Sequence, residues 1–252
     1  MTKVDVKYVE PPRGRLIGIG DVHGCISELN QLLDKLAVTS SDTVVFLGDL
    51  IDRGPDPEGV VQRVKELCDS GIGYCVMGNH DEKVIRYHNH VLKQKINPDY
   101  KIPMRNSPSY WALSSSSVTF LSQCPHAVYV QDSHPIVFVH AGLSPSLFNQ
   151  DPKAFIRNRY FVRNLNGKLT PVKSVEIDRI WHVPEGSYPW YDFWDGRWTV
   201  IYGHSVNLMP LVKNNTVGVD GGCVFGGFLR AWVKDGNNTF FVDVESKTAY
   251  SE

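Results

Sequence analysis

Short runs of apolar and β-branched residues recur along the chain, and five of them end in the same way. Each run is four or five residues long, as expected for a strand buried on both faces of its sheet. An Asp, Asn or His follows each run within a few residues, usually beside a glycine. The pattern predicts five strands with polar side chains at their C-terminal ends. The runs are Leu16–Ile19, Thr43–Leu47, Tyr74–Met77, Ile136–Val139 and Thr199–Tyr202.

Amphipathic segments separate the first three runs and predict two helices. The segment 26–37 has leucines at i, i+3, i+4 and i+7, which form a stripe that faces the core. The segment 56–69 begins with prolines that fit the first turn of a helix and continues with a valine-rich face. Strands that alternate with helices form parallel sheets with right-handed crossovers. The polar ends Asp21, Asp49 and Asn79 are therefore expected on one edge of one sheet.

The remaining segments are less periodic. We predict a helical insertion over 82–125, in which His88 and His90 are surface residues because positions i and i+2 do not share a helix face. Residues 150–198 are rich in Arg and Trp and predict long loops over a site. At 252 residues the chain can form one large α/β domain or two small ones, and we predict a single domain over 1–252. Three further strands are predicted at Thr216–Val219, Phe228–Val233 and Thr239–Val244.

Composition narrows the function classes. The net charge of −1 gives no overall field that would attract nucleic acid or an anionic membrane. The N-terminal stretch MTKVDVKYVE lacks an apolar signal core, and no apolar run is long enough to span a bilayer, so we expect a cytoplasmic protein. The five cysteines are scattered and contain no CxxC pair, which argues against a disulfide framework or zinc ribbon. We interpret Cys25 as a buried small hydrophobe rather than a reactive thiol.

The side chains at the five strand ends have the chemistry of a metal centre. They offer carboxylate oxygens and imidazole nitrogens without sulfur, which favours Mn²⁺, with Fe, Zn²⁺ or Co²⁺ as alternatives. Six ligands are too many for one catalytic metal with open positions, so we predict two divalent cations. A carboxylate bridges such a pair, and Asp49 is the predicted bridge. The six predicted ligands are Asp21, His23, Asp49, Asn79, His140 and His204.

The turn GDLIDRG at 48–54 carries more than a metal ligand. Arg53 offers a planar fork to two phosphate oxygens, which a lysine cannot do. Asp52 can hold one nitrogen of an imidazole so that the other nitrogen presents its proton. The alternative is a surface ion pair between Asp52 and Arg53. The arginines at 157, 159 and 163 form the best anion cluster in the chain, and Arg163 is the one expected to bind substrate.

Taken in order, GDVHG, GDLIDRG, GNHD, HAG and GH resemble the motifs of the binuclear-metal phosphoprotein phosphatases, the calcineurin-like metallophosphoesterase superfamily. The resemblance covers most of 16–225. It implies an α/β fold in which a two-sheet β-sandwich is flanked by helices, with the metals where the strand ends converge. It also implies that two sets of ligands share Asp49. The first set is Asp21, His23 and Asp49, and the second is Asp49, Asn79, His140 and His204.

The same resemblance implies catalytic roles at the ends of two strands. His80 would be the general acid, Asp52 would orient it, and Arg53 would clamp the phosphate. Asn79 and Arg163 are predicted to join Arg53 in binding substrate.

Within the superfamily the chain is most similar to the ApaH-like branch, which includes the symmetrical diadenosine tetraphosphatases. The similarity lies in GNHD rather than GNHE, in VDGGCVFGGFL and RYFVRNLNGKL, and in a short YPW. It implies hydrolysis of a dinucleoside polyphosphate, with diadenosine tetraphosphate giving two ADP, or of a related polyphosphate. The partner would then be a small molecule, and the sequence gives no oligomeric state.

Two alternatives remain open. Symmetrical tetraphosphatases usually lack the aspartate found here as Asp52, whereas protein phosphatases keep it. A seryl alkoxide is a basic leaving group that needs a general acid, while ADP leaves as a stable anion. A protein serine/threonine phosphatase is therefore the alternative enzyme. The non-enzymatic alternative is a scaffold with a structural metal, although structural sites are closed by ligands and these lie at an open sheet edge.

Overall fold

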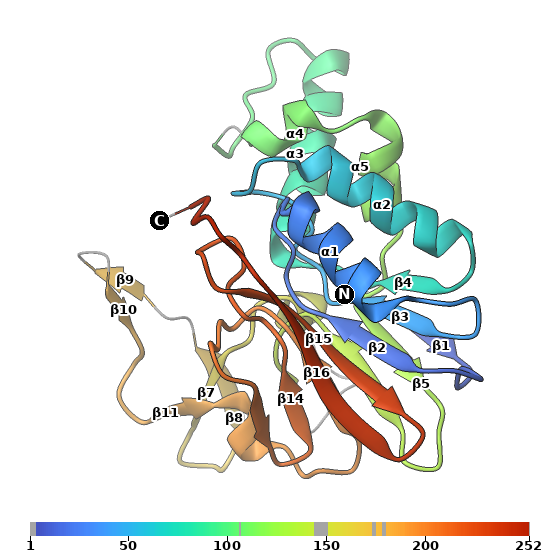
Figure 1. The fold of residues 1–252 in the computed structure, drawn as a ribbon. Coiled ribbons are helices and arrows are strands. Elements are labelled where there is room, and N and C mark those ends of the chain that lie inside the picture. Colours follow the sequence, from blue (N-terminus) through green and yellow to red (C-terminus); the bar gives the residue numbers. More distant parts are fainter. Residues whose placement is uncertain (1–3, 106, 144–150, 173–174, 178–179, 252) are drawn as a thin grey trace.

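Two β-sheets packed face to face form the centre of the molecule (Figure 1). The structure is a computed structural model that describes residues 4–105, 107–143, 151–172, 175–177 and 180–251. The six-stranded sheet contains, in spatial order, β1 (Val6–Val9), β5 (Ala127–Val130), β6 (Ile136–Val139), β12 (Thr199–Tyr202), β14 (Thr216–Gly218) and β13 (Leu211–Lys213). The five-stranded sheet contains β16 (Asn238–Glu245), β15 (Phe228–Asp235), β2 (Leu16–Ile19), β3 (Thr43–Phe46) and β4 (Gly73–Cys75). The predicted strands and the two-sheet sandwich are confirmed.

The inner faces of the two sheets share a core of alternating strand residues. Val45 of β3, Phe138 of β6 and Ile201 of β12 belong to this core and are fully buried. The sheets approach closely at Gly18 of β2, where an added Cβ would lie 2.9 Å from Phe138 Cε1 and 3.1 Å from Ile201 Cγ2. A side chain at this position would therefore push the two sheets apart.

Helices α1 (Ile26–Leu36) and α2 (Pro57–Asp69) cover the outer face of the five-stranded sheet (Figure 1). Both helices were predicted to within a residue at each end. The side chain of Asp56 caps α2 by accepting a hydrogen bond from the backbone N–H of Gly59 at 2.8 Å. Among the described residues, no helix is both long and apolar enough to cross a membrane.

The segment predicted as a helical insertion contains most of α3 (Asn79–Ile96), together with α4 (Pro108–Ala112) and α5 (Ser115–Ser122). Helix α3 begins three residues earlier than expected, directly at a strand end of the site. His88 and His90 are partly exposed, and neither belongs to a potential metal-ligand group among the described residues. Their Nδ1 atoms lie 3.1 Å from the hydroxyl of Tyr110 and 2.6 Å from that of Tyr100, so partners within the insertion hold both rings.

Short strands and helices occupy the segment 150–198, where the sequence predicted loops. A small sheet with the order β11-β7-β8 lies beside the main sandwich (Figure 1). These strands have three or four residues each, which is too short to produce a readable alternation of apolar and polar positions. The elements of this segment are α6 (Pro152–Phe155), β7 (Tyr160–Arg163), β8 (Leu169–Val172), β9 (Val175–Ile177), β10 (Ile180–His182), β11 (Ser187–Pro189) and the 3-10 helix Trp190–Phe193.

Gly18→Val tests the close approach of the sheets. The added side chain meets Phe138 and Ile201, and overpacking of a dense core typically costs about 1–3 kcal/mol. We expect the free energy of unfolding to fall by that amount in urea titrations. Thr239→Val, at an exposed position of β16 in the same sheet, is the control and should change it by less than about 0.5 kcal/mol. Equal stability of the Gly18→Val and unmutated chains would contradict the packing described here.

Candidate metal centre

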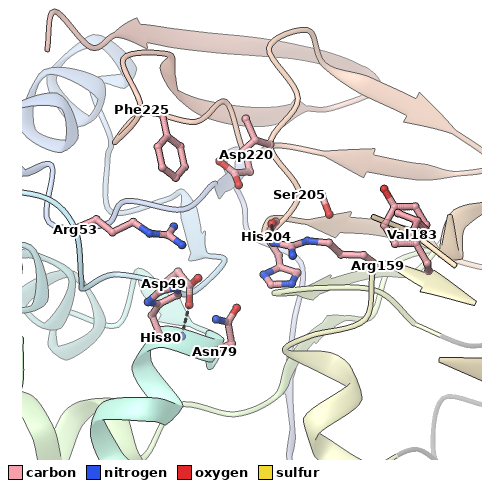
Figure 2. A pocket seen from close by; sticks show the side chains of 12 residues that line it. Asp49, Arg53, Asn79, His80, Arg159, Val183, His204, Ser205, Asp220 and Phe225 are labelled. Carbon is pink, nitrogen blue, oxygen red and sulfur yellow. Dashed lines mark hydrogen bonds between the residues drawn. The ribbon is translucent and has the colours of Figure 1, made fainter. Parts of the chain in front are cut away.

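The polar ends of five strands from both sheets lie close together, and Asp49, Asn79 and His204 among them line one cavity (Figure 2). β2, β3 and β4 run parallel in one sheet, and β6 and β12 run parallel in the other, so their C-terminal ends meet at the same edge. The cavity has a volume of about 550 Å³. The residues that line it include Asp49, Arg53, Asn79, His80, Arg159, His204 and Asp220.

Asp49 lies at the centre of the arrangement. Among the described residues there are three groups of potential ligand atoms in which all atoms lie within 4.8 Å of one another, and two of these groups include Asp49. The first group joins it to His23 and His80, and the second joins it to His140 and His204. A carboxylate shared by two such groups is the arrangement that bridges a pair of cations.

The geometry of His140 fits a bound cation. Its Nδ1 donates a hydrogen bond to the carbonyl oxygen of Leu47 at 2.7 Å. Nε2 faces Asp49 Oδ2 at 3.4 Å and His204 Nδ1 at 3.2 Å. Burial disfavours a charged imidazole, but the charges of Asp49 and Asp21 raise the pKa of His140 to about 9. Positive charge is therefore favoured at Nε2, where a bound cation would take the place of the proton.

His23 has the same design on the other side of Asp49. Its Nδ1 donates to the carbonyl oxygen of Ile51 at 2.8 Å, which leaves the lone pair on Nε2. Burial lowers the pKa of His23 to about 4, so the ring is neutral at physiological pH. Nε2 lies 3.7 Å from Asp49 Oδ2. A neutral imidazole whose Nε2 lies beside a carboxylate has the chemistry of a metal ligand.

Asp21 and Asn79 lie beside these two groups rather than within them. Oδ1 of Asp21 accepts a hydrogen bond from the backbone N–H of His204 at 3.0 Å and lies 3.9 Å from His140 Nδ1. The side-chain amide of Asn79 lies 3.0 Å from His140 Nε2. All six ligands predicted from the sequence are thus brought to one place, and His80 also enters the first group.

Strained backbone marks the site. Five of its non-glycine residues have positive φ values between 47° and 73°. This left-handed conformation is unfavourable for residues with a Cβ and persists only where the surroundings enforce it. The five residues are His23, Asp49, Asp52, Arg53 and His204.

Asp81 holds the Asp49 turn in this conformation. Its carboxylate accepts hydrogen bonds from the backbone N–H groups of Asp49 at 2.8 Å, Leu50 at 3.1 Å and Gly78 at 3.1 Å. The last aspartate of GNHD therefore holds the backbone of Asp49 in place. The neighbouring backbone N–H of His80 donates to Asp49 Oδ1 at 2.8 Å (Figure 2).

His80 and Asp52 form a hydrogen-bonded pair at the rim of the cavity. Nδ1 of His80 lies 2.7 Å from Asp52 Oδ2, and the hydroxyl of Ser109 donates to Asp52 Oδ1. Lys83 Nζ lies 3.6 Å from Asp52 Oδ2. Burial alone would raise the pKa of Asp52, but the bonds from His80 and Ser109 and the charge of Lys83 lower it to about 2. Asp52 is an ionised partner for His80 and not for Arg53, so the surface ion pair considered from the sequence does not form.

The arginines divide between the cavity and the surface. Arg53 enters from one side, where its Nη1 lies 2.8 Å from His23 Nε2. Arg159 enters from the opposite side and donates from Nη2 to the carbonyl oxygen of His204 at 2.7 Å (Figure 2). Arg163 is exposed on β7 with its guanidinium over the ring of Phe193 and is not among the described residues that line the cavity. Arg157 is paired with Glu82 at 2.7 Å.

Three residues of the site escaped the sequence analysis. Asp220, only 4% exposed, follows β14, which runs parallel to β12. It repeats the pattern of a strand followed by Asp and Gly, so the same signal could have found it. Ser109 reaches Asp52 from the insertion, and Phe225 places its ring over Arg53 with 5.2 Å between the ring centroid and Cζ. No local pattern indicates either of these contacts.

Comparison with known proteins agrees with this geometry. Parallel strands of two sheets that end around one shared carboxylate and several histidines are typical of a metallophosphoesterase. Residues 14–231 match the family described as calcineurin-like phosphoesterase, and the chain belongs to this family. It is therefore a phosphohydrolase, which excludes the scaffold alternative, and the family implies a dimetal centre.

Similar proteins carry tetraphosphatase names. The asymmetrical bis(5′-nucleosyl)-tetraphosphatase PrpE of Oceanobacillus iheyensis is 28% identical over 232 residues, covering 85% of this chain and 86% of the relative. The symmetrical bis(5′-nucleosyl)-tetraphosphatase of Janthinobacterium sp. (strain Marseille) is 28% identical over 257 residues, covering 84% and 90%. A solved structure described as a candidate diadenosine tetraphosphatase has a TM-score of 0.74 at 30% identity, covering 95% of this chain and 98% of that chain. The resemblance to the tetraphosphatase branch is confirmed.

Asp49→Asn tests the shared ligand. An amide has one ligand oxygen and no charge, so it cannot hold two cations as a bridging carboxylate does. We expect the variant to lose bound metal in elemental analysis and nearly all turnover of p-nitrophenyl phosphate, while its circular dichroism spectrum is unchanged. Asp34→Asn, on the exposed side of α1, is the matched control. Full activity of Asp49→Asn would refute the central role of this carboxylate.

Proposed function

We propose that the protein hydrolyses dinucleoside tetraphosphates at a centre of two divalent cations. The observation that carries this proposal is the pair of ligand groups that share Asp49, at the base of a cavity with an arginine on each side. A polyphosphate chain carries several negative charges, and two opposed guanidinium groups can hold it across the metal positions. The tetraphosphatase names of the relatives support the same substrate class.

The residues present fit Mn²⁺ as the cation at both positions. Carboxylate, amide and imidazole donors without thiolates suit Mn²⁺, with Fe, Zn²⁺ and Co²⁺ as alternatives. When bound, the two cations activate water and neutralise charge on the attacked phosphoryl group. Asp21, His23 and Asp49 would hold one cation. Asp49, Asn79, His140 and His204 would hold the other.

The protein side chains account for the rest of the reaction. Arg53 binds phosphoryl oxygens from one side of the cavity, and Asn79 approaches from its base. We assign the second clamp to Arg159 rather than Arg163, because Arg159 lines the cavity and Arg163 does not. Nδ1 of His80 is held by Asp52, so Nε2 can present a proton to the leaving oxygen.

A protein serine/threonine phosphatase is the second candidate function, and the His80–Asp52 pair favours it. An ionised Asp52 that orients an imidazole is useful when the leaving group is a basic alkoxide. An anhydride leaving group such as ADP needs this help much less. The pair is intact and reinforced by Ser109, so monoester hydrolysis is a specific rival to anhydride hydrolysis.

Product analysis with three substrates decides between these functions. The Mn²⁺-loaded chain is given diadenosine tetraphosphate, inorganic polyphosphate and a phosphoserine peptide in parallel, and kcat/KM is compared. The proposal predicts the highest kcat/KM for diadenosine tetraphosphate. The products expected from the sequence are two molecules of ADP. AMP and ATP as products would instead assign the asymmetrical reaction. A higher kcat/KM for the phosphopeptide would establish the rival function.

Asp52→Asn separates the two types of leaving group. General acid catalysis typically contributes about 10²–10⁴ in rate, and the contribution grows with the basicity of the leaving oxygen. We expect this variant to slow hydrolysis of a seryl or alkyl monoester by that factor and of diadenosine tetraphosphate much less. Ser109→Ala should act in the same direction with a smaller effect. Equal losses with both substrates would show that the pair does not donate a proton.

Arg159→Ala tests which arginine completes the phosphate clamp. A hydrogen bond to a charged group typically contributes about 1.5–3 kcal/mol, which corresponds to at least about a tenfold loss of kcat/KM. Arg163→Ala is the matched control from the same segment, and its kcat/KM should stay within about twofold because its guanidinium lies outside the cavity lining. The reverse order of effects would return the role to Arg163.

A further inference from the structure

An exposed apolar surface lies at the edge of the charged cavity. Phe225 is 39% exposed and Val206 is 47% exposed, and both line the cavity together with Arg53 and Asp220. These two apolar side chains lie next to each other at the edge of a polar cavity, where an apolar part of a ligand could cover them. We call these two residues the apolar ledge.

Tight turns fix the two side chains next to each other. Phe225 follows Gly222, whose φ is +71°, and its N–H donates to the carbonyl oxygen of that glycine at 2.9 Å. A Cβ on Gly222 would lie 2.8 Å from Val206 Cγ1 and 3.8 Å from Phe225 Cδ2, so both side chains flank the same glycine. An isolated antiparallel β-bridge to Ala249 also holds the backbone of Phe225. The ledge is a preformed surface.

The ledge lies next to Arg53, the proposed phosphate clamp. Cζ of Arg53 lies 5.2 Å from the centroid of the Phe225 ring, and both side chains face the cavity (Figure 2). A phosphate held by Arg53 would therefore lie next to the ledge. A nucleoside brings a flat aromatic base to that distance, and bases stack on exposed aromatic side chains without needing specific hydrogen bonds.

We propose that the ledge formed by Phe225 and Val206 binds one nucleobase of the substrate. This inference rests on the proposed function, since it assigns the part of a dinucleoside polyphosphate that lies outside the metal centre. The ledge offers no hydrogen-bond donors or acceptors of its own side chains, so it should accept adenine and guanine alike. Selection for nucleotides over bare polyphosphate would then come from stacking.

The test compares a substrate that has bases with one that has none. For each chain, the KM for diadenosine tetraphosphate is divided by the KM, or the competitive inhibition constant, of inorganic tripolyphosphate. Loss of base stacking typically costs about 1–3 kcal/mol, so Phe225→Ala should raise this ratio by about 5- to 150-fold. Val206→Ser, the second ledge variant, should raise it at least about twofold. Phe240→Ala removes an equally exposed aromatic of β16 that is not among the described lining residues, and it is the control.

The outcomes separate the ledge from the proposed function. A raised ratio in both ledge variants and an unchanged ratio in Phe240→Ala supports base binding. Equal increases for both ligands in Phe225→Ala would show that the ring serves only Arg53, and the ledge would be rejected. An effect on a phosphoserine peptide but not on the nucleotide would reject it as well. If the unmutated chain cleaves diadenosine tetraphosphate poorly, the proposed function is wrong, and the inference that the ledge binds a nucleobase is rejected with it.

Discussion

The rest of the structure depends on one electrostatic constraint. Three carboxylates and three imidazoles are buried close together between the two sheets. Asp21, Asp49 and Asp220 are each at most 5% exposed, and the imidazoles of His23, His140 and His204 are each at most 9% exposed. Buried carboxylates without enough counter-charge are strongly unfavourable. Divalent cations would supply that charge. The donor set therefore has the chemistry of a metal centre, whatever reaction it serves.

The backbone is shaped to serve this constraint. Parallel strands of two sheets end at one edge, which brings together residues that are far apart in the chain. The turns that follow adopt left-handed conformations, and Asp81 secures the one at Asp49 with two backbone hydrogen bonds. Such strain is held by the surrounding core, in which the sheets touch at Gly18. Rigid packing thus supports the precise placement of ligands.

The sequence predicts the parts of this arrangement that have local signals. Apolar runs followed by Asp, Asn or His identified the strands and the six predicted ligands, because a strand end and its polar residue are neighbours in the chain. Contacts between distant segments left no such signal. Ser109 reaches Asp52 across 57 positions, and Arg159, not Arg163, enters the cavity because short strands of 150–198 orient this segment. Asp220 did have a local signal, a strand followed by Asp and Gly, which is the same pattern that identified the five predicted strand ends.

The number and coupling of bound metal ions test the central claim most directly. The unmutated chain would be loaded with Mn²⁺, freed of excess metal, and studied by elemental analysis and electron paramagnetic resonance. Cations bridged by a carboxylate lie about 3.5–4 Å apart and couple magnetically. Two Mn²⁺ per chain with an exchange-coupled spectrum is the predicted result. One ion per chain, or two ions with uncoupled spectra, would contradict a centre built around Asp49.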